Sequence, residues 1–343
     1  MEKLLTVKDV AEYLQMSKEK VYKLAQQGKI PVSRIENQWR FRLDKINAWL
    51  EVNELGSISI STRHLSPQLS IKPEPFLKWA GGKGQLLRQY EIFFPDKFNN
   101  YLEPFVGGGA VFFHLYNTGR IPLDKKIILI DSNEELINCY KVIKTDVERL
   151  IKILGSGKYK NEKDTFYKIR QDVPKDPFEK AARTIYLNRT CFNGLYRVNS
   201  KGKFNVPFGR YKNPLICNTV NLKAVSFALR SVEILCADFA ICLELAKKGD
   251  FVYLDPPYQP LNKTSNFTSY TKDSFDEDEQ CRLYDVFRKL DRKGCKVMLS
   301  NSDTAFIKKL YKNYRLEHVL AKRAINCKPS GRGAIDELVI LNY

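Results

Sequence analysis

Short apolar runs alternate with helical patterns from Phe76 to the end of this 343-residue chain. This alternation is typical of units in which parallel strands are joined by helices that cover the sheet. The sequence therefore predicts an α/β domain with a largely parallel sheet over residues 76–343. Ahead of this domain, residues 53–75 are rich in Ser and Pro and lack a sustained period, which predicts a linker.

Residues 1–52 form a separate, compact helical pattern. Thr6 is placed to cap a first helix whose apolar residues recur at helical spacing. A short turn at 16–17 leads into a second helix that Gly28 closes, and a run around Trp39 predicts a small β wing. The order of helix, tight turn, helix and wing predicts a winged helix-turn-helix.

This first region resembles the excisionase-type DNA-binding modules over residues 3–51. The resemblance implies that the second helix enters the major groove of DNA and that arginines of the wing touch phosphates. The residues expected to contact DNA are Ser17, Lys18, Lys20, Lys23, Arg40 and Arg42. A small helical module that docks another protein and carries a solvated basic face is the alternative.

The formal net charge of +18 favours a polyanionic partner, of which nucleic acid is the commonest. A basic surface kept for solubility would account for this charge as well. No apolar run reaches the roughly 20 residues that a membrane-spanning helix needs, and the first residues lack the apolar core of a signal peptide. We therefore expect a cytoplasmic, DNA-associated protein that does not enter a membrane.

The eight cysteines include no Cys-x-x-Cys pair, and only three histidines could help them to hold a metal. Zinc sites need closely paired ligands, and a reducing cytosol keeps thiols free. The sequence therefore predicts no structural metal and no disulfide.

Residues 76–85 hold a glycine pair beside Lys83. A phosphate-binding loop of the Walker type needs Ser or Thr directly after its lysine, and here Gly84 follows. Binding of a nucleoside triphosphate is therefore not favoured.

A second glycine-rich segment covers residues 101–110, where a strand ends near Glu103 and a turn brings the backbone close to a ligand at a helix N-terminus. A dinucleotide-binding loop would need a further glycine where Phe112 stands, so this loop suits a smaller ligand. The next strand, 126–130, closes on Asp131. That carboxylate is placed to accept hydrogen bonds from a ribose diol, or simply to cap the following helix.

The sharpest feature is the apolar strand at 251–254, which runs directly into Asp255, Pro256, Pro257 and Tyr258. The two prolines remove two backbone donors and hold the chain extended, so that carbonyls can face a ligand. Asp255 adds an acceptor and Tyr258 an aromatic face, which together suit an exocyclic amine on a ring. Acceptors at Asp255 and at the Pro256 carbonyl would bind the positive charge that develops on adenine N6 during in-line methyl transfer from a sulfonium. A turn that closes a surface strand is the alternative.

These four segments, in this order, resemble the Dam-type, alpha-class (D12) adenine N6 DNA methyltransferases. The likeness covers residues 76–343 and implies a Rossmann-like sheet that binds S-adenosylmethionine and methylates adenine in duplex DNA. It also implies that Asp255, Pro256, Pro257 and Tyr258 are the catalytic residues. Carried over position by position, the cofactor-binding residues are Trp79, Lys83, Glu103, Phe105, Gly107, Gly109, Asp131, Asp238, Phe239 and Asp255.

The insertion between the two halves of this domain, residues 135–230, interleaves basic, amide and aromatic side chains over residues 187–213. Such side chains read base edges, stack on bases and bind phosphates. In the family this is the target-recognition region, and this version is similar to that of the GATC-specific members. The residues expected to contact DNA are Asn193, Arg197, Lys201, Lys203, Arg210 and Lys212. A helical insertion that packs by its aromatic residues is the alternative.

A paired adenine hides N6 inside the stack, so the enzyme must flip the nucleotide into its pocket, where Tyr258 would stack on the base. The polar stretch 259–275 is expected to cover the site once DNA arrives, or to be a plain surface loop. A second DNA-facing loop is expected at 322–333 because it carries basic residues and glycines.

The sequence thus predicts a monomeric, site-specific adenine methyltransferase that protects DNA from a cognate restriction endonuclease. Two other functions stay open: a DNA-binding regulator whose methyltransferase-like domain is inactive, and an RNA adenine methyltransferase. The intact motifs argue against the first, and the narrow major groove of A-form RNA argues against the second.

Overall fold

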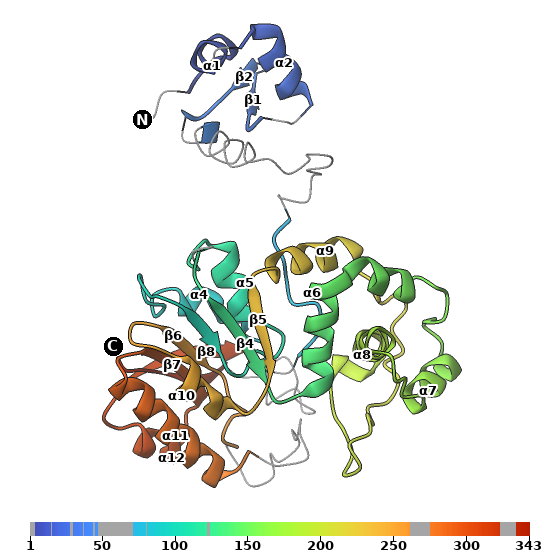
Figure 1. The fold of residues 1–343 in the computed structure, drawn as a ribbon, viewed down its shortest axis with the longest axis vertical. Coiled ribbons are helices and arrows are strands. Elements are labelled where there is room, and N and C mark those ends of the chain that lie inside the picture. The colour runs from blue at the N-terminus through green and yellow to red at the C-terminus, as the bar shows by residue number, and fades with distance from the viewer. Residues whose placement is uncertain are drawn as a thin grey trace. The chain divides into compact units, whose positions relative to one another are not determined.

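The computed structural model describes residues 4–14, 16–27, 30–36, 38–43, 45–46, 71–79, 81–121, 124–260, 275–322 and 334–343. Gly28, residues 53–70 of the expected linker, and the loop positions 261–274 and 323–333 lie outside this described part. The chain divides into two compact units, residues 1–66 and residues 67–343 (Figure 1). Each unit is described by itself.

The first unit contains two helices and a two-stranded antiparallel sheet. Helix α1 (Val7–Tyr13) begins with a capping box, because Thr6 Oγ1 accepts from the Asp9 N–H while the Asp9 carboxylate accepts from the Thr6 N–H. The other elements are α2 (Lys18–Gln26), β1 (Ser33–Ile35) and β2 (Gln38–Arg40). This arrangement confirms the expected helix-turn-helix with its small wing. The core that joins the helices to the wing consists of Val10, Ala11, Val21, Ala25, Ile30, Phe41 and Ile46.

The second unit is built on a seven-stranded sheet with the order β5-β4-β3-β6-β7-β9-β8. Its strands are β3 (Tyr101–Glu103), β4 (Ile127–Asp131), β5 (Val232–Cys236), β6 (Phe251–Leu254), β7 (Lys296–Ser302), β8 (Arg315–Lys322) and β9 (Ala334–Leu341). The first five strands in this order pair in parallel, and β9 runs antiparallel to both β7 and β8. This confirms the predicted Rossmann-like α/β domain. The strand order reverses between β3 and β6, and ligands bind at such a switch point in open α/β sheets.

Helices cover both faces of this sheet (Figure 1). They are α4 (Leu87–Tyr90), α5 (Ala110–Asn117), α6 (Glu134–Leu154), α7 (Lys163–Gln171), α8 (Pro177–Thr190), α9 (Thr219–Ala228), α10 (Cys242–Leu245), α11 (Glu277–Arg292) and α12 (Ala305–Leu310). One core cluster joins α4–α9 to strand residues such as Tyr101, Leu129 and Tyr253. The other joins α10–α12 to the alternate strand residues, such as Leu102 and Ile130, as the period of two along a strand requires. None of the helices in the described part of the chain is long and apolar enough to cross a membrane.

Residues 135–230, the expected target-recognition insertion, contain most of α6, all of α7–α9 and an irregular segment between α8 and α9. Helix α6 packs against both α8 and α9. The irregular segment folds back on itself through bridges between Cys191 and Phe208 and between Val198 and Phe204. This insertion therefore forms a helical layer that carries one exposed, hairpin-like segment.

Candidate active site

Four polar side chains follow the core residues of β3, β4, β6 and β7 on one face of the sheet: Glu103, Asp131, Asp255 and Ser300. The residue before each of them packs in the core on the opposite face, and successive strand residues alternate between faces. Since β3, β4, β6 and β7 are parallel neighbours, these side chains gather at the carboxyl edge of the sheet. This edge is the candidate active site.

Asp255 is held by one of its two carboxylate oxygens. The Lys83 Nζ lies 2.7 Å from Oδ1, and the Ser300 hydroxyl donates a 2.9 Å hydrogen bond to the same atom. The Tyr253 hydroxyl lies 2.9 Å from Ser300 Oγ and donates to it in turn. Burial raises the pKa of Asp255, and the Lys83 ammonium opposes that rise. Among the described residues no hydrogen bond reaches Oδ2, which leaves this oxygen able to accept from a substrate.

Lys83 is almost fully buried, with 4% of its surface exposed. Besides its contact with Asp255, its ammonium donates to the Gly81 carbonyl at 2.7 Å and lies 4.8 Å from the centre of the Tyr258 ring. A carboxylate and an aromatic face offset part of the cost of burying this cation. Lys83 therefore ties the first glycine segment to both ends of the Asp-Pro-Pro-Tyr turn.

The two prolines of the turn present their carbonyls differently. The Pro257 carbonyl accepts a 3.0 Å hydrogen bond from Gln280 Nε2. No hydrogen bond among the described residues reaches the Pro256 carbonyl. One of the two carbonyls that the sequence analysis expected to be free is therefore occupied, and the other remains an acceptor.

The Tyr258 hydroxyl donates a 2.7 Å hydrogen bond to Oε2 of Glu337 on β9. Glu337 lies opposite Ser302 in the β7–β9 pair, at the same edge of the sheet. Burial raises the pKa of Glu337, against the effects of the Lys83 ammonium and the Tyr258 hydroxyl. Glu337 was not expected here, because its one sequence signal is a carboxylate at the start of the apolar run 338–341.

The turn after β3 needs its glycines because the backbone is left-handed and crowded there. Gly107 has a φ of 48°, and a Cβ at this position would lie 2.9 Å from Cδ1 of Trp79. Gly109 has a φ of 74°, and its Cβ would lie 2.6 Å from the Tyr140 hydroxyl oxygen. The Trp79 ring stacks on Tyr196, with 5.1 Å between the ring centres. The turn therefore offers a cradle of bare backbone between the two glycine segments.

Asp131 fastens this turn to β4. Its Oδ2 accepts from the Gly107 N–H at 3.1 Å, and its Oδ1 accepts from the Asn133 N–H at 2.9 Å. Burial raises the pKa of Asp131 to about 6, against these backbone hydrogen bonds. Each oxygen retains a further lone pair, so the carboxylate can still accept hydrogen bonds from a hydroxyl group.

Glu103 is buried, with 2% of its surface exposed, and accepts a 2.8 Å hydrogen bond from the Tyr101 hydroxyl. Burial raises the pKa of Glu103 well above the usual carboxyl range, and the nearby Asp255 charge adds to the rise. Glu103 therefore lies within the floor of the site rather than on its surface.

An aromatic cluster lies past the ends of β3 and β5. The rings of Phe105 and Phe239 stack with 5.2 Å between their centres, and Phe275 lies 5.9 Å from each. Arg282 binds both oxygens of Asp238 at 2.8 Å and places its guanidinium 4.0 Å from the centre of the Phe239 ring. These contacts lower the pKa of Asp238. The cluster suits a flat heterocycle with a polar edge, and Arg282 was not expected from the sequence.

Comparison with known proteins identifies the family of this fold and site. The D12 class N6 adenine-specific DNA methyltransferase family matches residues 79–325. The chain belongs to this family. A helix-turn-helix domain family matches residues 4–53. These matches confirm the family, the fold and the enzyme class that the sequence predicted.

Several relatives of this D12 methyltransferase are similar over the whole α/β unit. The type II methyltransferase M.MjaIII of Methanocaldococcus jannaschii is 50% identical over 289 residues, which cover 79% of this chain and 99% of the relative. The type II methyltransferase M1.LlaDCHI of Lactococcus lactis subsp. cremoris is 44% identical, with 80% and 96% covered. The DNA adenine methylase of Haemophilus influenzae is 37% identical, with 81% and 96% covered.

The D12 methyltransferase carries its expected DNA-contacting residues on the segment between α8 and α9. All of them are exposed: Asn193, Arg197, Lys201, Lys203, Arg210 and Lys212. Asn193 and Arg210 have φ values of 55° and 56°, which non-glycine residues adopt rarely. A hairpin holds the segment, because the Asn199 N–H donates to the Lys203 carbonyl at 2.9 Å and the Asn205 N–H donates to the Arg197 carbonyl at 3.0 Å.

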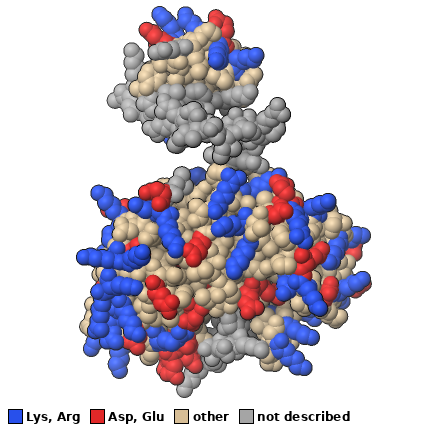
Figure 2. Space-filling model, viewed as in Figure 1, with Lys and Arg blue, Asp and Glu red and all other residues tan. Residues whose placement is uncertain are grey.

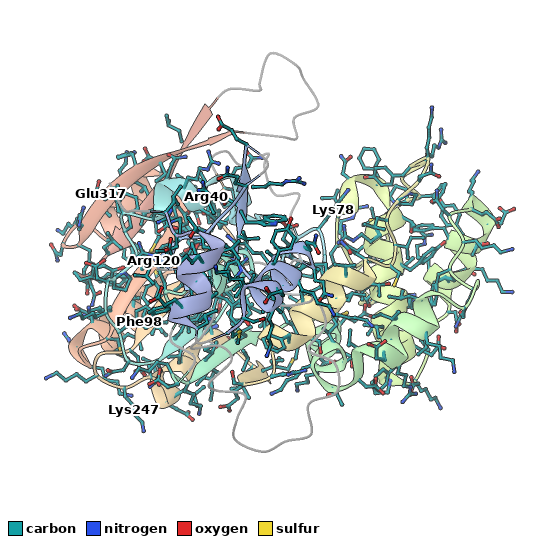
Figure 3. All side chains as sticks on the ribbon, turned by 90° about the horizontal axis from the view of Figure 1, so that it is seen from above. Arg40, Lys78, Phe98, Arg120, Lys247 and Glu317 are labelled. Carbon is teal, nitrogen blue, oxygen red and sulfur yellow. The ribbon has the colours of Figure 1, made fainter. Side chains whose placement is uncertain are left out.

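The buried side of this hairpin packs toward the cofactor half of the D12 methyltransferase. Tyr196 and Phe204 are buried, with 5.8 Å between their ring centres. Lys78, labelled in Figure 3, exchanges two 2.8 Å hydrogen bonds between its backbone and the Asn188 side chain, and its ammonium lies 4.9 Å from the Tyr211 ring centre. The expected core role of these aromatic residues therefore coexists with an exposed basic edge.

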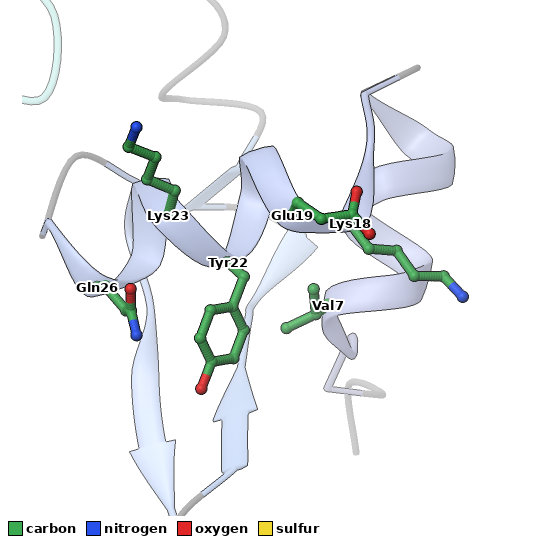
Figure 4. Close-up of a pocket in the computed structure, with 6 residues that line it drawn as sticks. All are labelled: Val7, Lys18, Glu19, Tyr22, Lys23 and Gln26. Atoms are coloured by element: carbon green, nitrogen blue, oxygen red, sulfur yellow. The ribbon is translucent and has the colours of Figure 1, made fainter.

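Basic side chains are distributed over the surface of the D12 methyltransferase. Figure 2 shows Lys and Arg across the visible face of the α/β unit, with Asp and Glu between them. In the helix-turn-helix unit, Lys20 and Lys23 are exposed on α2, and a shallow hollow beside them is lined by Val7, Lys18, Glu19, Tyr22, Lys23 and Gln26 (Figure 4). Arg40 is half-buried and bonds to the Trp39 carbonyl at 3.1 Å and to the Gln38 side chain.

Proposed function

We propose that this enzyme transfers the methyl group of S-adenosylmethionine to N6 of an adenine that is flipped out of duplex DNA. The observation that carries the proposal is the pair of open acceptors, Asp255 Oδ2 and the Pro256 carbonyl, which follow one another on a proline-stiffened turn. An exocyclic amine has two N–H groups and therefore needs two acceptors. Lys83 and Ser300 hold the other oxygen of Asp255 and so orient the free one.

The described residues fit S-adenosylmethionine. The glycine cradle at 107–109 admits a ligand where a Cβ would be excluded, Asp131 can accept from ribose hydroxyls, and the aromatic cluster can hold the adenine ring of the cofactor. Trp79, Lys83, Glu103 and Asp238 complete this assignment as the residues around these three parts. Bound there, the cofactor would supply an electrophilic methyl group on a positively charged sulfur.

The chain's own residues would make N6 a better nucleophile. The N6 lone pair is delocalised into the adenine ring, and two acceptors on its hydrogens favour a more tetrahedral nitrogen. The Asp255 carboxylate also stabilises the positive charge that develops on N6, because its position is set before the reaction. Tyr258 offers a ring on which the flipped base can stack. After transfer, the methylated N6 is acidic and releases its extra proton without a strong base.

The target sequence proposed for this enzyme is GATC. Support comes from the resemblance of residues 187–213 to the GATC-specific members and from the exposed amide and basic side chains of the hairpin. Asn193 and Arg197 are the candidates for base contacts, and Lys201, Lys203, Arg210 and Lys212 are the candidates for phosphate contacts.

The helix-turn-helix unit is proposed as a second DNA contact. Its exposed Lys20 and Lys23 lie on α2, the helix expected in the major groove, and Arg40 lies on the wing. The enzyme is proposed to act as a monomer and to protect DNA from a cognate restriction endonuclease. The type II methyltransferase names of two relatives support this last point.

Sequencing of modified bases in DNA from a methylation-free host that expresses the chain tests the proposal. The expected result is N6-methyladenine confined to GATC. Methylated cytosine, or no modification by an enzyme that is soluble and folded, would overturn the assignment of the reaction. N6-methyladenine in a different sequence would overturn only the GATC assignment.

A further inference from the structure

The Asp-Pro-Pro-Tyr turn cannot fasten itself. Pro256 and Pro257 have no N–H group, so the turn must be held through its carbonyls and through the residues that follow it. Two fully buried amides, Gln280 on α11 and Asn301 on β7, lie against it with 0% of their surfaces exposed.

Gln280 uses both ends of its side-chain amide. Its Nε2 donates to the Pro257 carbonyl at 3.0 Å, and its Oε1 accepts from Asn301 Nδ2 at 3.0 Å. A buried amide is stable only when its donor and its acceptor are both satisfied. The orientation of the Gln280 amide therefore depends on Asn301.

Asn301 is oriented by two backbone donors. Its Oδ1 accepts from the N–H of Gln259 at 3.1 Å and from the N–H of Ser302 at 2.8 Å. With Oδ1 committed to these donors, Nδ2 must face Gln280. The Ser302 hydroxyl donates to the Gln259 carbonyl at 2.6 Å and completes the attachment of the turn to β7.

We propose that Gln280 and Asn301 are positioning residues that hold the Pro257 carbonyl away from the substrate and so leave the Pro256 carbonyl as the second acceptor for adenine N6. This inference rests on the function proposed above. Both residues act through the turn and contact neither the base nor the cofactor. Their effect is to set which carbonyl is available and where it lies relative to Asp255 Oδ2.

The first test replaces Gln280 by Met, which keeps the length of the side chain and removes both hydrogen bonds. The expected result is a fall in kcat of about 10²-fold, the scale of a misplacement of about 1 Å at a reacting centre, with an unchanged KM for S-adenosylmethionine. The matched control is Asn221→Leu. Asn221 is also a buried amide with two 2.9 Å bonds, to the backbone N–H and carbonyl of Glu74, and it does not contact the turn. Asn221→Leu should lower the melting temperature similarly and leave kcat within twofold of the wild type.

The second test replaces Gln280 by Glu and measures kcat from pH 6 to pH 8.5. A protonated carboxyl can donate to the Pro257 carbonyl and accept from Asn301, whereas an ionised carboxylate repels that carbonyl, and burial raises the pKa of such a group. The ratio of variant to wild-type kcat should therefore rise as the pH falls. The other titratable groups around the turn, Asp255, Glu277 and Glu337, are present in both proteins, so the ratio removes their contributions to first order.

A folded Gln280→Met variant with wild-type kcat would overturn the inference, as would a Gln280→Glu ratio that is flat with pH. If Gln280→Met does not fold, the pH dependence of the Glu variant decides alone. Failure of the proposed function is distinguishable, because it would appear in the wild type as the absence of N6-methyladenine in duplex DNA.

Discussion

The ammonium of Lys83 lies 2.7 Å from Oδ1 of Asp255, and both side chains are largely buried. The pair joins a glycine segment that precedes β3 to a turn that follows β6, 172 positions later in the chain. Because this contact occupies one oxygen of the carboxylate and keeps it ionised against burial, the chemistry of Asp255 depends on a residue that the sequence motif around it does not contain.

Replacement of Lys83 by Met should move the activity of the enzyme to higher pH. Without the ammonium, burial raises the pKa of Asp255 further, by about one unit or more. The ionised form that accepts from N6 then appears only at higher pH, so the acid limb of the kcat/KM profile shifts upward and the rate at neutral pH falls at least about tenfold. Lys78→Met is the control, since Lys78 also contacts an aromatic ring but not Asp255; an unshifted acid limb for Lys83→Met would contradict the argument.

Asp255→Asn should abolish turnover while the fold and cofactor binding persist. The Asn oxygen can take over the contacts with Lys83 and Ser300, but its NH₂ group then replaces Oδ2 and meets the N6 donors of adenine. Loss of this acceptor is expected to lower kcat about 10³-fold. Single-turnover methylation and calorimetric titration with S-adenosylmethionine measure the two effects separately, and a variant with full activity would refute the assigned chemistry.

The parts of this site that the sequence predicted all lie directly after an apolar run. Glu103, Asp131 and Asp255 each follow a strand, and the order of the strands along the chain was sufficient to predict a parallel sheet with these carboxylates at its edge. The resemblance of the motifs to a known family supplied their expected roles. Local sequence was enough because each of these residues is positioned by its own strand.

The parts that the sequence did not predict depend on pairing between distant segments. Ser300 is 45 positions from Asp255, and Glu337 is 79 positions from Tyr258. Both lie on strands whose places in the sheet follow from the β6–β7 and β7–β9 registers. Arg282 reaches Asp238 across 44 positions from a helix on which it looks like any solvated arginine. No local pattern marks these residues, because their partners are set by tertiary packing.

The affinity for S-adenosylmethionine should weaken as the pH falls through about 6. Burial places the pKa of Asp131 at about 6, above the usual carboxyl value of about 3.9, so the folded protein loses this charge as the pH drops below 6. A neutral carboxyl is a weaker acceptor for ribose hydroxyls, and KM for the cofactor should rise while kcat at saturation changes less. In Asp131→Asn the pH dependence should disappear and KM should be high throughout, because one of the two backbone N–H groups then faces an NH₂ group. A KM that is flat from pH 5 to pH 7.5 in the wild type would contradict this assignment.

Loss of the Glu337 carboxylate should disturb the base-stacking ring rather than the cofactor site. In Glu337→Leu the Tyr258 hydroxyl has no acceptor, and a buried hydroxyl without a partner costs about 1–3 kcal/mol, so the ring is expected to leave its position beside Lys83. The KM for DNA should rise several-fold, and the fluorescence of 2-aminopurine at the target adenine should report weaker stacking. Tyr258→Phe removes the same hydrogen bond, so the effects of the two substitutions should not add in the double variant. Full additivity would show that the two side chains act independently.

Deletion of residues 1–70 should leave methylation of short duplexes intact and reduce the salt dependence of DNA binding. The deletion ends before Glu74 because the Glu74 backbone is bonded to Asn221 on α9 and belongs to the α/β unit. If Lys20, Lys23 and Arg40 each neutralise one phosphate, the slope of log K against log salt becomes less steep by about 2 to 3. Full-length protein with these three residues replaced by Gln provides the matched control and should show the same change in slope. Because the catalytic carboxylate and its contacts lie entirely within residues 81–337, an equal slope in all three proteins would mean that the helix-turn-helix unit recognises something other than DNA.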